Sequence, residues 1–474
     1  TLFRSVRPTF NPVHNYVRIT GDFINYDARD EIADVTLAVT DGKGKQLGAT
    51  SLKIDELAYV EGFLPLGDVP HGEYSVTLTC LDADGKEVLR RDSTFAKKDP
   101  AEAFDWWNTE HGNIERVIAP WTPVTYKDNA FGVWGRTMRA GTAGLPAQVT
   151  TQGEDLLAGP VTLVAELPDG TTAKPIPIRM SAKVKLDADH RKTVVFRGDV
   201  GPLSMTSEVT VEFDGMYKIT LGLAGRGAKP VTVKSLKLVV PFTHEAAEYV
   251  HAAGEGIRTG FYYGFLPDDR TGRIWDCTAV SSQPMGVGSF IPYVWVGSTD
   301  GGMCWFADSD RGWTPSDATP AIEIVRDADS TNLVLNLISA ADTIDEPRTI
   351  TFAFQASPAK KMHAGWRDSP WWCGDTFYDF AFSGSTIWNA LPFPTDVEKS
   401  REMVAKVHKQ GKLAVPYFIH QNLPPHLVPE VRYFGDQWRT SISECLYYGK
   451  TLTDFMVHSY GEWARLCDID GYYV

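Results

Sequence analysis

The sequence predicts a multi-domain protein: an immunoglobulin-like β-sandwich, a large two-sheet β-sandwich of the supersandwich type, and the first part of a truncated (β/α)8 TIM barrel. Three observations lead to this prediction. The chain has 474 residues, which is too long for one ordinary hydrophobic core. Apolar residues alternate at period two, with Asp-Gly turns between the runs, up to about residue 361. Helical patterns and short apolar runs alternate after that point.

Residues 1–98 form the predicted immunoglobulin-like sandwich. Val35, Leu37 and Val39 lie on one face of a predicted strand, because successive side chains of a strand point to opposite faces. Asp41-Gly42 and Asp84-Gly85 supply the positive-φ turns that hairpins favour. Several short strands separated by such turns are typical of this sandwich, which we interpret as an accessory module.

Residues 99–361 form the second, larger sandwich, after a boundary marked by Pro100. Asp169-Gly170 and Asp214-Gly215 again indicate hairpins, and the number of strands implies two packed sheets. The region also carries an aromatic cluster that we interpret as core rather than as a binding platform. Its members are Trp295, Trp305, Phe306 and Trp313.

The stretch HEAAEYVH, His244 to His251, resembles the HExxH zinc motif but has Glu248 where that motif has its second histidine. On a helix, His244, Glu248 and His251 would share one face. We interpret the stretch as a short amphipathic helix without a metal. The six cysteines are scattered and have no metal-ligand spacing, so no metal site is predicted.

Residues 362–474 contain the predicted start of the barrel. A first strand is expected near Ala381–Ala390, and a helix begins at a capping box with Thr395 as N-cap and ends at Gly411. A second strand is predicted over Leu413–Ile419. A second helix follows, capped by Thr451.

Tyr472, Tyr473 and Val474 then read as a third strand. Strand–helix–strand–helix–strand order is typical of right-handed crossovers in a parallel sheet. The segment is too short for a closed barrel, which needs roughly 250 residues. We therefore expect the remainder of the barrel to follow Val474. The alternative is a small open α/β domain that ends in an edge strand.

Composition and charge exclude several classes of partner. The chain is 43 % hydrophobic and 22 % charged, as in soluble globular proteins, and has no apolar run long enough to span a membrane. Its net charge of −14 argues against nucleic acid or an anionic membrane as the main partner. The chain begins at Thr1 without an initiator methionine, so the lack of a signal peptide does not decide its location.

Two parts of the second region resemble the N-terminal sandwich of glycoside hydrolase family 123-like proteins. The first comprises APWTPV, VWGR and GLPAQVTTQGEDLLAGPV between Ala119 and Val161. The second comprises YVWVGSTDGGMCWFADSDRGW from Tyr293 to Trp313 and RTITFAFQASPAKK from Arg348 to Lys361. The resemblance implies a bacterial, secreted carbohydrate-active enzyme, extracellular or periplasmic, in which a sandwich precedes a TIM barrel. It implies activity on β-linked N-acetylhexosamine, above all N-acetylgalactosamine, without a cofactor.

The family's chemistry, as the resemblance implies it, is substrate-assisted: the 2-acetamido oxygen of the sugar attacks the anomeric carbon. An adjacent Asp-Glu pair orients that group and protonates the leaving oxygen. The chain has Asp30-Glu31, Asp55-Glu56 and Asp345-Glu346, all in predicted β-sandwich turns. Barrel enzymes carry their catalytic groups at the carboxyl ends of barrel strands. The catalytic pair is therefore expected after Val474.

Side chains that follow the predicted barrel strands are candidates for binding the carbohydrate substrate. A polar triple follows the second strand, a Trp-Asn pair closes the first, and a tryptophan lies in the long loop. Capping of a βα loop and core packing are the competing roles. The candidates are Trp388, Asn389, His420, Gln421, Asn422 and Trp438.

Two other functions remain open at this point. A retaining glycosidase of the α-galactosidase type also has a large sandwich before a barrel, and it would need a nucleophilic aspartate on the barrel. A non-catalytic glycan-binding or surface scaffold protein could keep the same fold. The sequence does not decide the oligomeric state.

Overall fold

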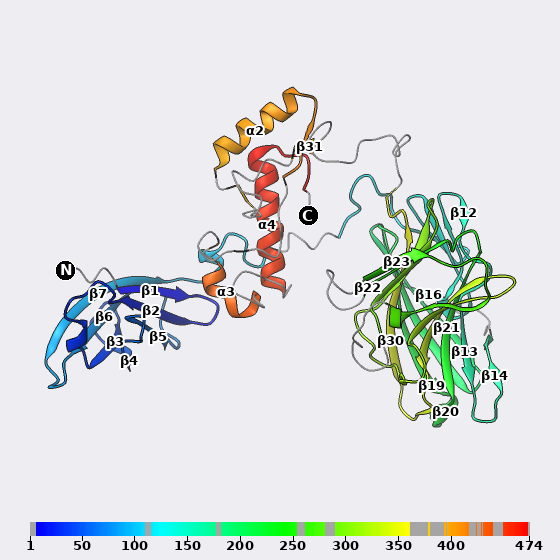
Figure 1. Cartoon of the computed structure of the whole chain (residues 1–474), viewed down its shortest axis with the longest axis horizontal. Coiled ribbons are helices and arrows are strands. Elements are labelled where there is room, and N and C mark those ends of the chain that lie inside the picture. Colours follow the sequence, from blue (N-terminus) through cyan, green and yellow to red (C-terminus); the bar gives the residue numbers. More distant parts are fainter. Residues whose placement is uncertain are drawn as a thin grey trace. The chain divides into compact units, whose positions relative to one another are not determined.

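The computed structural model describes residues 6–109, 115–176, 182–253, 261–279, 290–360, 378–379, 393–394, 396–416, 423, 428, 430–438 and 449–472. The chain divides into two compact units (Figure 1). Unit 1 comprises Thr1–Asn113 and Ser369–Val474, and unit 2 comprises Ile114–Asp368. Unit 1 thus contains both the predicted immunoglobulin-like module and the predicted α/β segment.

The N-terminal part of unit 1 is a two-sheet antiparallel sandwich, as predicted. One sheet has the strand order β1-β2-β5 and the other β4-β3-β6-β7, which is the arrangement of an immunoglobulin-like fold. The strands are β1 (Val6–Asn11), β2 (Tyr16–Asp22), β3 (Asp34–Thr40), β4 (Gln46–Leu52), β5 (Tyr59–Pro65), β6 (Gly72–Leu81) and β7 (Glu87–Lys97).

The core of this module follows the period-two pattern of its strands. Val35, Leu37 and Val39 are fully buried between the sheets. Tyr74, near the start of β6, donates its hydroxyl to Pro70 O at 2.5 Å. A tyrosine that bonds back to the backbone upstream of this strand is a hallmark of immunoglobulin-like sandwiches, where it fixes the corner between two strands.

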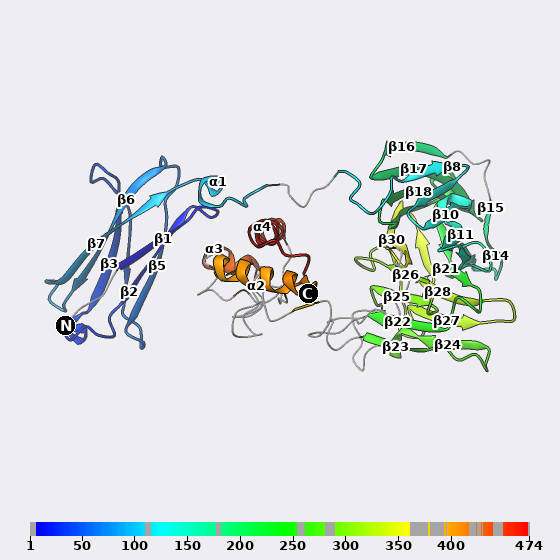
Figure 2. The ribbon, with the colours of Figure 1, turned by 90° about the horizontal axis from the view of Figure 1, so that it is seen from above.

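Unit 2 is built from two large antiparallel sheets, with smaller sheets beside them (Figure 2). The larger sheet has ten strands, in the order β15-β17-β18-β19-β30-β26-β25-β22-β23 with β16 paired to β17. Its strands are β15 (Pro175–Ile176), β16 (Lys183–Ala188), β17 (Arg191–Val200), β18 (Leu203–Glu212), β19 (Tyr217–Gly225), β22 (Tyr249–Ala253), β23 (Phe261–Phe265), β25 (Tyr293–Gly297), β26 (Gly302–Phe306) and β30 (Arg348–Ser357).

The second large sheet has six strands and faces the first across one continuous hydrophobic core. It runs in the order β14-β13-β21-β28-β27-β24. The strands are β13 (Thr162–Glu166), β14 (Thr172–Ala173), β21 (Ser235–Phe242), β24 (Gly272–Asp276), β27 (Ile322–Arg326) and β28 (Thr331–Ile338). The prediction of a large two-sheet sandwich is confirmed.

Smaller elements complete unit 2. A five-stranded sheet and a two-stranded ribbon lie beside the large sheets. The five-stranded sheet comprises β8 (Thr125–Lys127), β9 (Ala130–Val133), β10 (Arg136–Ala140), β11 (Pro146–Thr151) and β12 (Glu154–Asp155). The ribbon comprises β20 (Val231–Val233) and β29 (Asp342–Ile344).

The predicted helix over residues 244–251 is wrong. Residues 249–251 belong to β22, which pairs with β23 and β25, and His244 and Glu248 precede it in turns and bends. His244 Nδ1 lies 3.0 Å from Thr331 Oγ1. The sheet has overridden the helical spacing of this stretch, because β22 pairs along its whole length on both sides.

The C-terminal part of unit 1 has mixed α and β structure. Strand β31 (Tyr378–Asp379) pairs in parallel with β32 (Leu413–Ala414), and helix α2 (Val397–Lys409) lies between them in sequence. The N-cap of α2 is Asp396, whose carboxylate accepts from Lys399 N at 3.0 Å, so the N-cap lies one residue after the predicted one and N3 is Lys399 rather than Glu398. Thr395 itself lies outside the described residues.

The end of α2 follows the prediction, since Gly411 has a φ of +70° directly after the C-cap. Strand β32 covers Leu413 and Ala414 of the strand predicted over Leu413–Ile419, and residues 417–419 lie outside the described residues. After helix α4 (Lys450–Cys467) the chain returns beside β32, where Asp470 N donates to Ala414 O at 2.9 Å. Segments that follow one another in the chain thus lie side by side, from β31 to β32 to Asp470. Consecutive βα units produce this order.

Helices α3 (Val431–Trp438) and α4 pack with residues of the link that follows the immunoglobulin-like module. Phe104, next to helix α1 (Pro100–Ala103), lies 5.5 Å from Phe434 between ring centroids. Asn11 Nδ2 also donates to Tyr433 O at 2.9 Å. Among the helices that the structure describes, none combines the length and apolarity of a membrane-spanning segment.

Candidate functional site

The outer face of the ten-stranded sheet carries a row of aromatic and polar side chains across five neighbouring strands. Tyr263 on β23 lies opposite His251 on β22, which lies opposite Trp295 on β25. Trp295 lies opposite Cys304 on β26, and Cys304 opposite Gln355 on β30. Residues in such register point to one face of the sheet, and strands lie about 4.8 Å apart. The row therefore spans five adjacent strands of one surface.

Trp295 lies flat on this face because two glycines leave room for it. A Cβ added to Gly297 would lie 2.1 Å from Trp295 Cζ2, and one added to Gly302 would lie 2.6 Å from the same atom. The indole Nε1 donates to Ser357 Oγ at 2.9 Å on β30. The ring is thus held over the backbone of β25 and β26, with its polar atom already bonded.

An open pocket with a volume of about 550 Å³ lies on this part of the sheet. Its wall includes Trp295, His251, Tyr293, Gln355 and Ser357. The rings of His251 and Tyr293 meet edge to face, with centroids 5.5 Å apart. A volume of this size falls within the range of small-molecule sites.

Burial holds the Cys304 thiol and the Tyr293 phenol of the pocket in their neutral forms. Burial raises the pKa of the Cys304 thiol to about 11, so the thiol stays protonated and donates to Gln355 O at 3.4 Å. Burial, with a smaller contribution from Cys304, raises the pKa of Tyr293 to about 12. Neither group is a nucleophile at neutral pH, because the reactive forms are the thiolate and the phenolate. The pocket is suited to binding rather than to covalent chemistry.

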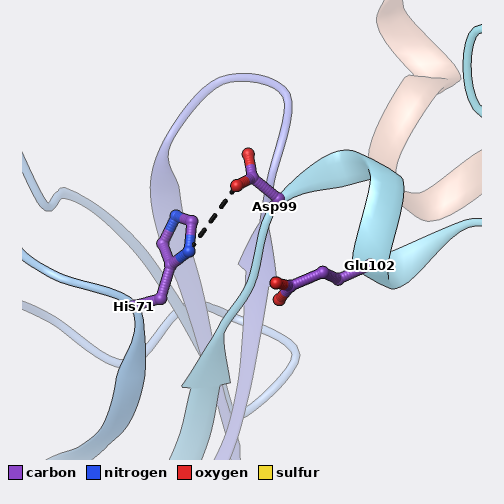
Figure 3. A group of neighbouring side chains, drawn as sticks. All are labelled: His71, Asp99 and Glu102. Carbon is purple, nitrogen blue, oxygen red and sulfur yellow. Dashed lines mark ion pairs between the residues drawn. The ribbon is translucent and has the colours of Figure 1, made fainter.

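One group of described side chains has the spacing of metal ligands, on unit 1 (Figure 3). His71, Asp99 and Glu102 each offer a ligand atom, and these atoms lie within 4.8 Å of one another. All three side chains are exposed, and His71 Nδ1 lies 3.6 Å from Asp99 Oδ2, an ion-pair distance. Exposed acidic groups of this kind are common on protein surfaces without a bound ion, so no metal is assigned to the group.

Most sequence-predicted site residues lie outside the described part of the chain. These are Trp388, Asn389, His420, Gln421 and Asn422.

Trp438 is described, and it lies in a hydrophobic cluster with 1 % of its surface exposed. Its ring stacks on Phe434 with centroids 4.8 Å apart, and its Nε1 donates to Thr451 Oγ1 at 2.9 Å. Trp438 has no ring face to offer a sugar in this arrangement, and its role is core packing.

The three Asp-Glu pairs lie in exposed turns, as predicted. Asp30 and Glu31 belong to a short 3-10 helix, and Asp345 and Glu346 lie between β29 and β30. Asp55 accepts from the backbone N–H groups of Leu57 and Tyr59, at 2.9 and 2.8 Å, and so closes its own turn. These carboxylates are solvated turn residues.

Sequence reasoning missed the outer row of the sheet. It grouped Trp295 with Trp305, Phe306 and Trp313 as core. Trp305 and Trp313 are indeed buried, at 1 % and 9 % exposure, but Trp295 and Phe306 are only half-buried and lie on the other face. The available signal was the parity of the positions along the paired strands.

Part of the sandwich of unit 2 is similar to a domain of a glycoside hydrolase family. Residues 124–308 match the family model for glycoside hydrolase 123, third domain. This match confirms the resemblance seen in the sequence, and the matched range includes four of the five strands that carry the outer row: β22, β23, β25 and β26.

Solved structures share only a distant likeness. The glycoside hydrolase 36 α-galactosidase AgaA from Geobacillus stearothermophilus is 11 % identical, with a TM-score of 0.30, over 74 % of this chain and 65 % of that one. Galactose 1-epimerase from Lactobacillus acidophilus is 8 % identical, with a TM-score of 0.29, over 50 % of this chain and 98 % of that one. Likeness at this level does not bear on activity. No curated protein matches the chain.

Proposed function

We propose that the chain is part of a glycoside hydrolase that cleaves β-linked N-acetylhexosamine, with N-acetylgalactosamine as the preferred sugar. The match of residues 124–308 to the glycoside hydrolase 123 third domain carries this proposal. The parallel pairing of β31 with β32 across α2, and the contact of Asp470 with Ala414, support a (β/α)8 barrel that begins in unit 1.

The proposed mechanism is substrate-assisted with retention of configuration. The acetamido carbonyl oxygen forms a bond to the anomeric carbon as the glycosidic C–O bond breaks, and the leaving oxygen takes a proton from a glutamic acid. Water then opens the resulting oxazolinium ring. An aspartate beside that glutamate orients the acetamido group. No metal or organic cofactor takes part.

The expected position of the Asp-Glu acid pair comes from the sequence. The Asp-Glu pairs of the described residues are turn carboxylates, and we place the pair at the end of a barrel strand after Val474. An extracellular or periplasmic location in a bacterium is also part of the proposal. Cell fractionation with an antibody to the protein tests that location.

The activity is tested with the protein from the reading frame that contains this chain. p-Nitrophenyl β-N-acetylgalactosaminide is the substrate, and p-nitrophenyl β-galactoside, which lacks the acetamido group, is the matched control. We expect turnover of the first and at least about 100-fold less of the second, because the acetamido oxygen is the nucleophile.

Replacement of the barrel-strand glutamate by glutamine should abolish release from substrates with poor leaving groups. Equal turnover of the two substrates contradicts the substrate-assisted mechanism. Turnover of p-nitrophenyl α-galactoside alone would favour a retaining α-galactosidase-type enzyme. Glycan binding without turnover of any substrate would favour a non-catalytic scaffold.

A further inference from the structure

The outer row of the ten-stranded sheet continues into two strongly exposed aromatic rings. Tyr263 and Phe265 lie on β23, at the edge of the sheet, and are 73 % and 76 % exposed. They are two residues apart, so both point to the same face as His251 and Tyr249, which they oppose. Phe265 and Tyr249 have ring centroids 4.8 Å apart. An aromatic patch exposed in this way usually marks a binding surface.

We define the aromatic surface as Tyr263, Phe265, His251, Tyr293, Trp295 and Gln355. Its rings extend from the edge strand β23 through β22 to the flat indole on β25, and Gln355 lies two strands further along on β30. Five strands at about 4.8 Å spacing give a surface about 19 Å wide. That width accommodates several sugar rings of an extended oligosaccharide.

The indole of Trp295 is held in place by its surroundings on this surface. Gly297 and Gly302 leave space under the ring, and Ser357 Oγ accepts its N–H. Because the polar atom of the indole is already bonded to the sheet, the ring contributes an apolar face and needs no further partner. Flat apolar faces are complementary to the C–H faces of pyranose rings.

The charges of the pocket indicate what kind of ligand fits it. Its described wall contains no carboxylate, ammonium or guanidinium group, and its thiol and phenol are held protonated. Hydrogen-bonding groups are present nonetheless, in Tyr293 and Gln355. A neutral ligand with hydroxyl groups and apolar faces suits this wall, whereas an anionic one finds no ammonium or guanidinium partner.

We propose that the aromatic surface binds a neutral oligosaccharide, with Trp295 and the Tyr263–Phe265 pair as two platforms on which sugar rings stack. The polar groups between the platforms fix the orientation of the chain through its hydroxyls. This binding rests on side chains of unit 2 alone and does not require that the protein cleave the ligand.

The test measures binding of cellotriose to the purified protein by isothermal titration calorimetry. Cellotriose is neutral and has no acetamido group, so the proposed mechanism cannot hydrolyse it, and its binding is independent of the proposed activity. Trigalacturonate serves as the anionic trisaccharide. We expect a dissociation constant for cellotriose of about 1 mM or below, and at least about tenfold weaker binding of trigalacturonate.

Two substitutions remove one platform each, and a third substitution serves as a matched control. Phe265→Ala acts on an exposed ring, and Trp295→Ala removes the indole; each should weaken cellotriose binding at least about tenfold. Phe63→Ala removes a 52 % exposed phenylalanine from β5 of unit 1 and should leave binding unchanged. Trp295→Phe, which keeps a ring over the glycines, should bind better than Trp295→Ala if stacking is the cause.

Three outcomes overturn the proposal. One is a wild-type protein that binds no cellotriose at concentrations well above about 1 mM. Another is binding that Phe265→Ala and Trp295→Ala, with native circular dichroism, leave unchanged. The third is a concentration-dependent dimer that Phe265→Ala dissolves, which would make the surface an interface between two copies of this chain.

Discussion

The two faces of the ten-stranded sheet use the same kinds of residue for different purposes. On the inner face Trp305 is 1 % exposed and belongs to the core between the sheets, with Trp313 5.9 Å away between ring centroids. On the outer face Trp295 lies flat over two glycines with its N–H bonded to Ser357. Both tryptophans belong to the same hairpin of β25 and β26.

This difference shows that a shift of one residue along a strand decides which face of the sheet a side chain occupies. Trp295 lies opposite Cys304, so Trp305, the next residue, points to the other side of the sheet. Composition cannot separate two tryptophans in one hairpin, but the parity of their positions does. The predictions below test whether the inner and outer faces differ in stability and chemistry as their geometry implies.

The largest expected difference between the faces is in stability. Trp305→Ala removes a fully buried indole and should lower the free energy of unfolding of unit 2 by about 3–5 kcal/mol. Trp295→Ala removes a half-buried ring and one hydrogen bond, and should cost about 1–2 kcal/mol. Differential scanning calorimetry of the whole chain measures both shifts.

The assignment of the calorimetric transition to unit 2 needs a separate measurement, because a chain with two compact units does not unfold in two states. Hydrogen exchange of the β25 and β26 amides supplies it. Equal costs for the two substitutions would contradict the division into an inner core and an outer surface.

The second prediction concerns the thiol of the outer face. Burial raises the pKa of Cys304 from 9.0 to about 11, which lowers its thiolate fraction at pH 8 about 100-fold. Alkylation of Cys304 by iodoacetamide, followed by peptide mass spectrometry, should be slower in the folded protein than in urea by at least that factor.

The same shift affects stability at high pH. The unfolded chain ionises this thiol near pH 9, and the folded chain does so only near pH 11. The contribution of the protonated thiol is therefore complete below pH 9 and declines as the pH rises towards 11. Cys304→Ser should reduce this decline. Rapid labelling of Cys304 at pH 8 in the folded protein would show that the pocket is more open to water than its geometry indicates.

Much of the fold follows from the sequence, because local signals and packing agree there. Period-two alternation places Val35, Leu37 and Val39 in the first core, and Gly411 ends α2 in a positive-φ conformation. The prediction of a helix from His244 to His251 is wrong because the polar residues of this stretch fit a helical spacing by coincidence. Pairing of β22 with strands on both sides outweighs local propensity there.

The candidate site was less accessible to sequence reasoning. Its members come from five strands between residues 249 and 357, and their neighbours are decided by strand order, which no local pattern encodes. The order β30-β26-β25-β22-β23 brings Gln355 within two strands of Trp295 across 60 residues of chain. Gly297 and Gly302 resemble ordinary turn residues in the sequence, and only the structure shows that they make room for an indole.

A smaller effect is expected where the outer face depends on one hydrogen bond. Ser357→Ala removes the acceptor of the Trp295 N–H and should lower the free energy of unfolding of unit 2 by about 1 kcal/mol. The indole should then rotate away from the sheet, which a change in its fluorescence would report in comparison with the Trp295→Phe protein. Unchanged fluorescence would mean that the glycines alone hold the ring in place.

The smallest expected effect on stability belongs to Phe265→Ala. The ring is 76 % exposed on the edge strand, so its removal creates no buried cavity and leaves the core between the sheets untouched. The free energy of unfolding should change by no more than about 0.5 kcal/mol, as for other surface substitutions. Phe352→Ala, on β30 of the same sheet, is the inner-face counterpart and should cost about 3–5 kcal/mol, because Phe352 is 2 % exposed. A cost for Phe265→Ala that approaches the cost for Phe352→Ala would mean that another part of the protein covers the aromatic surface in solution. That surface would then be part of a core, and the contrast between the two faces would no longer hold at β23.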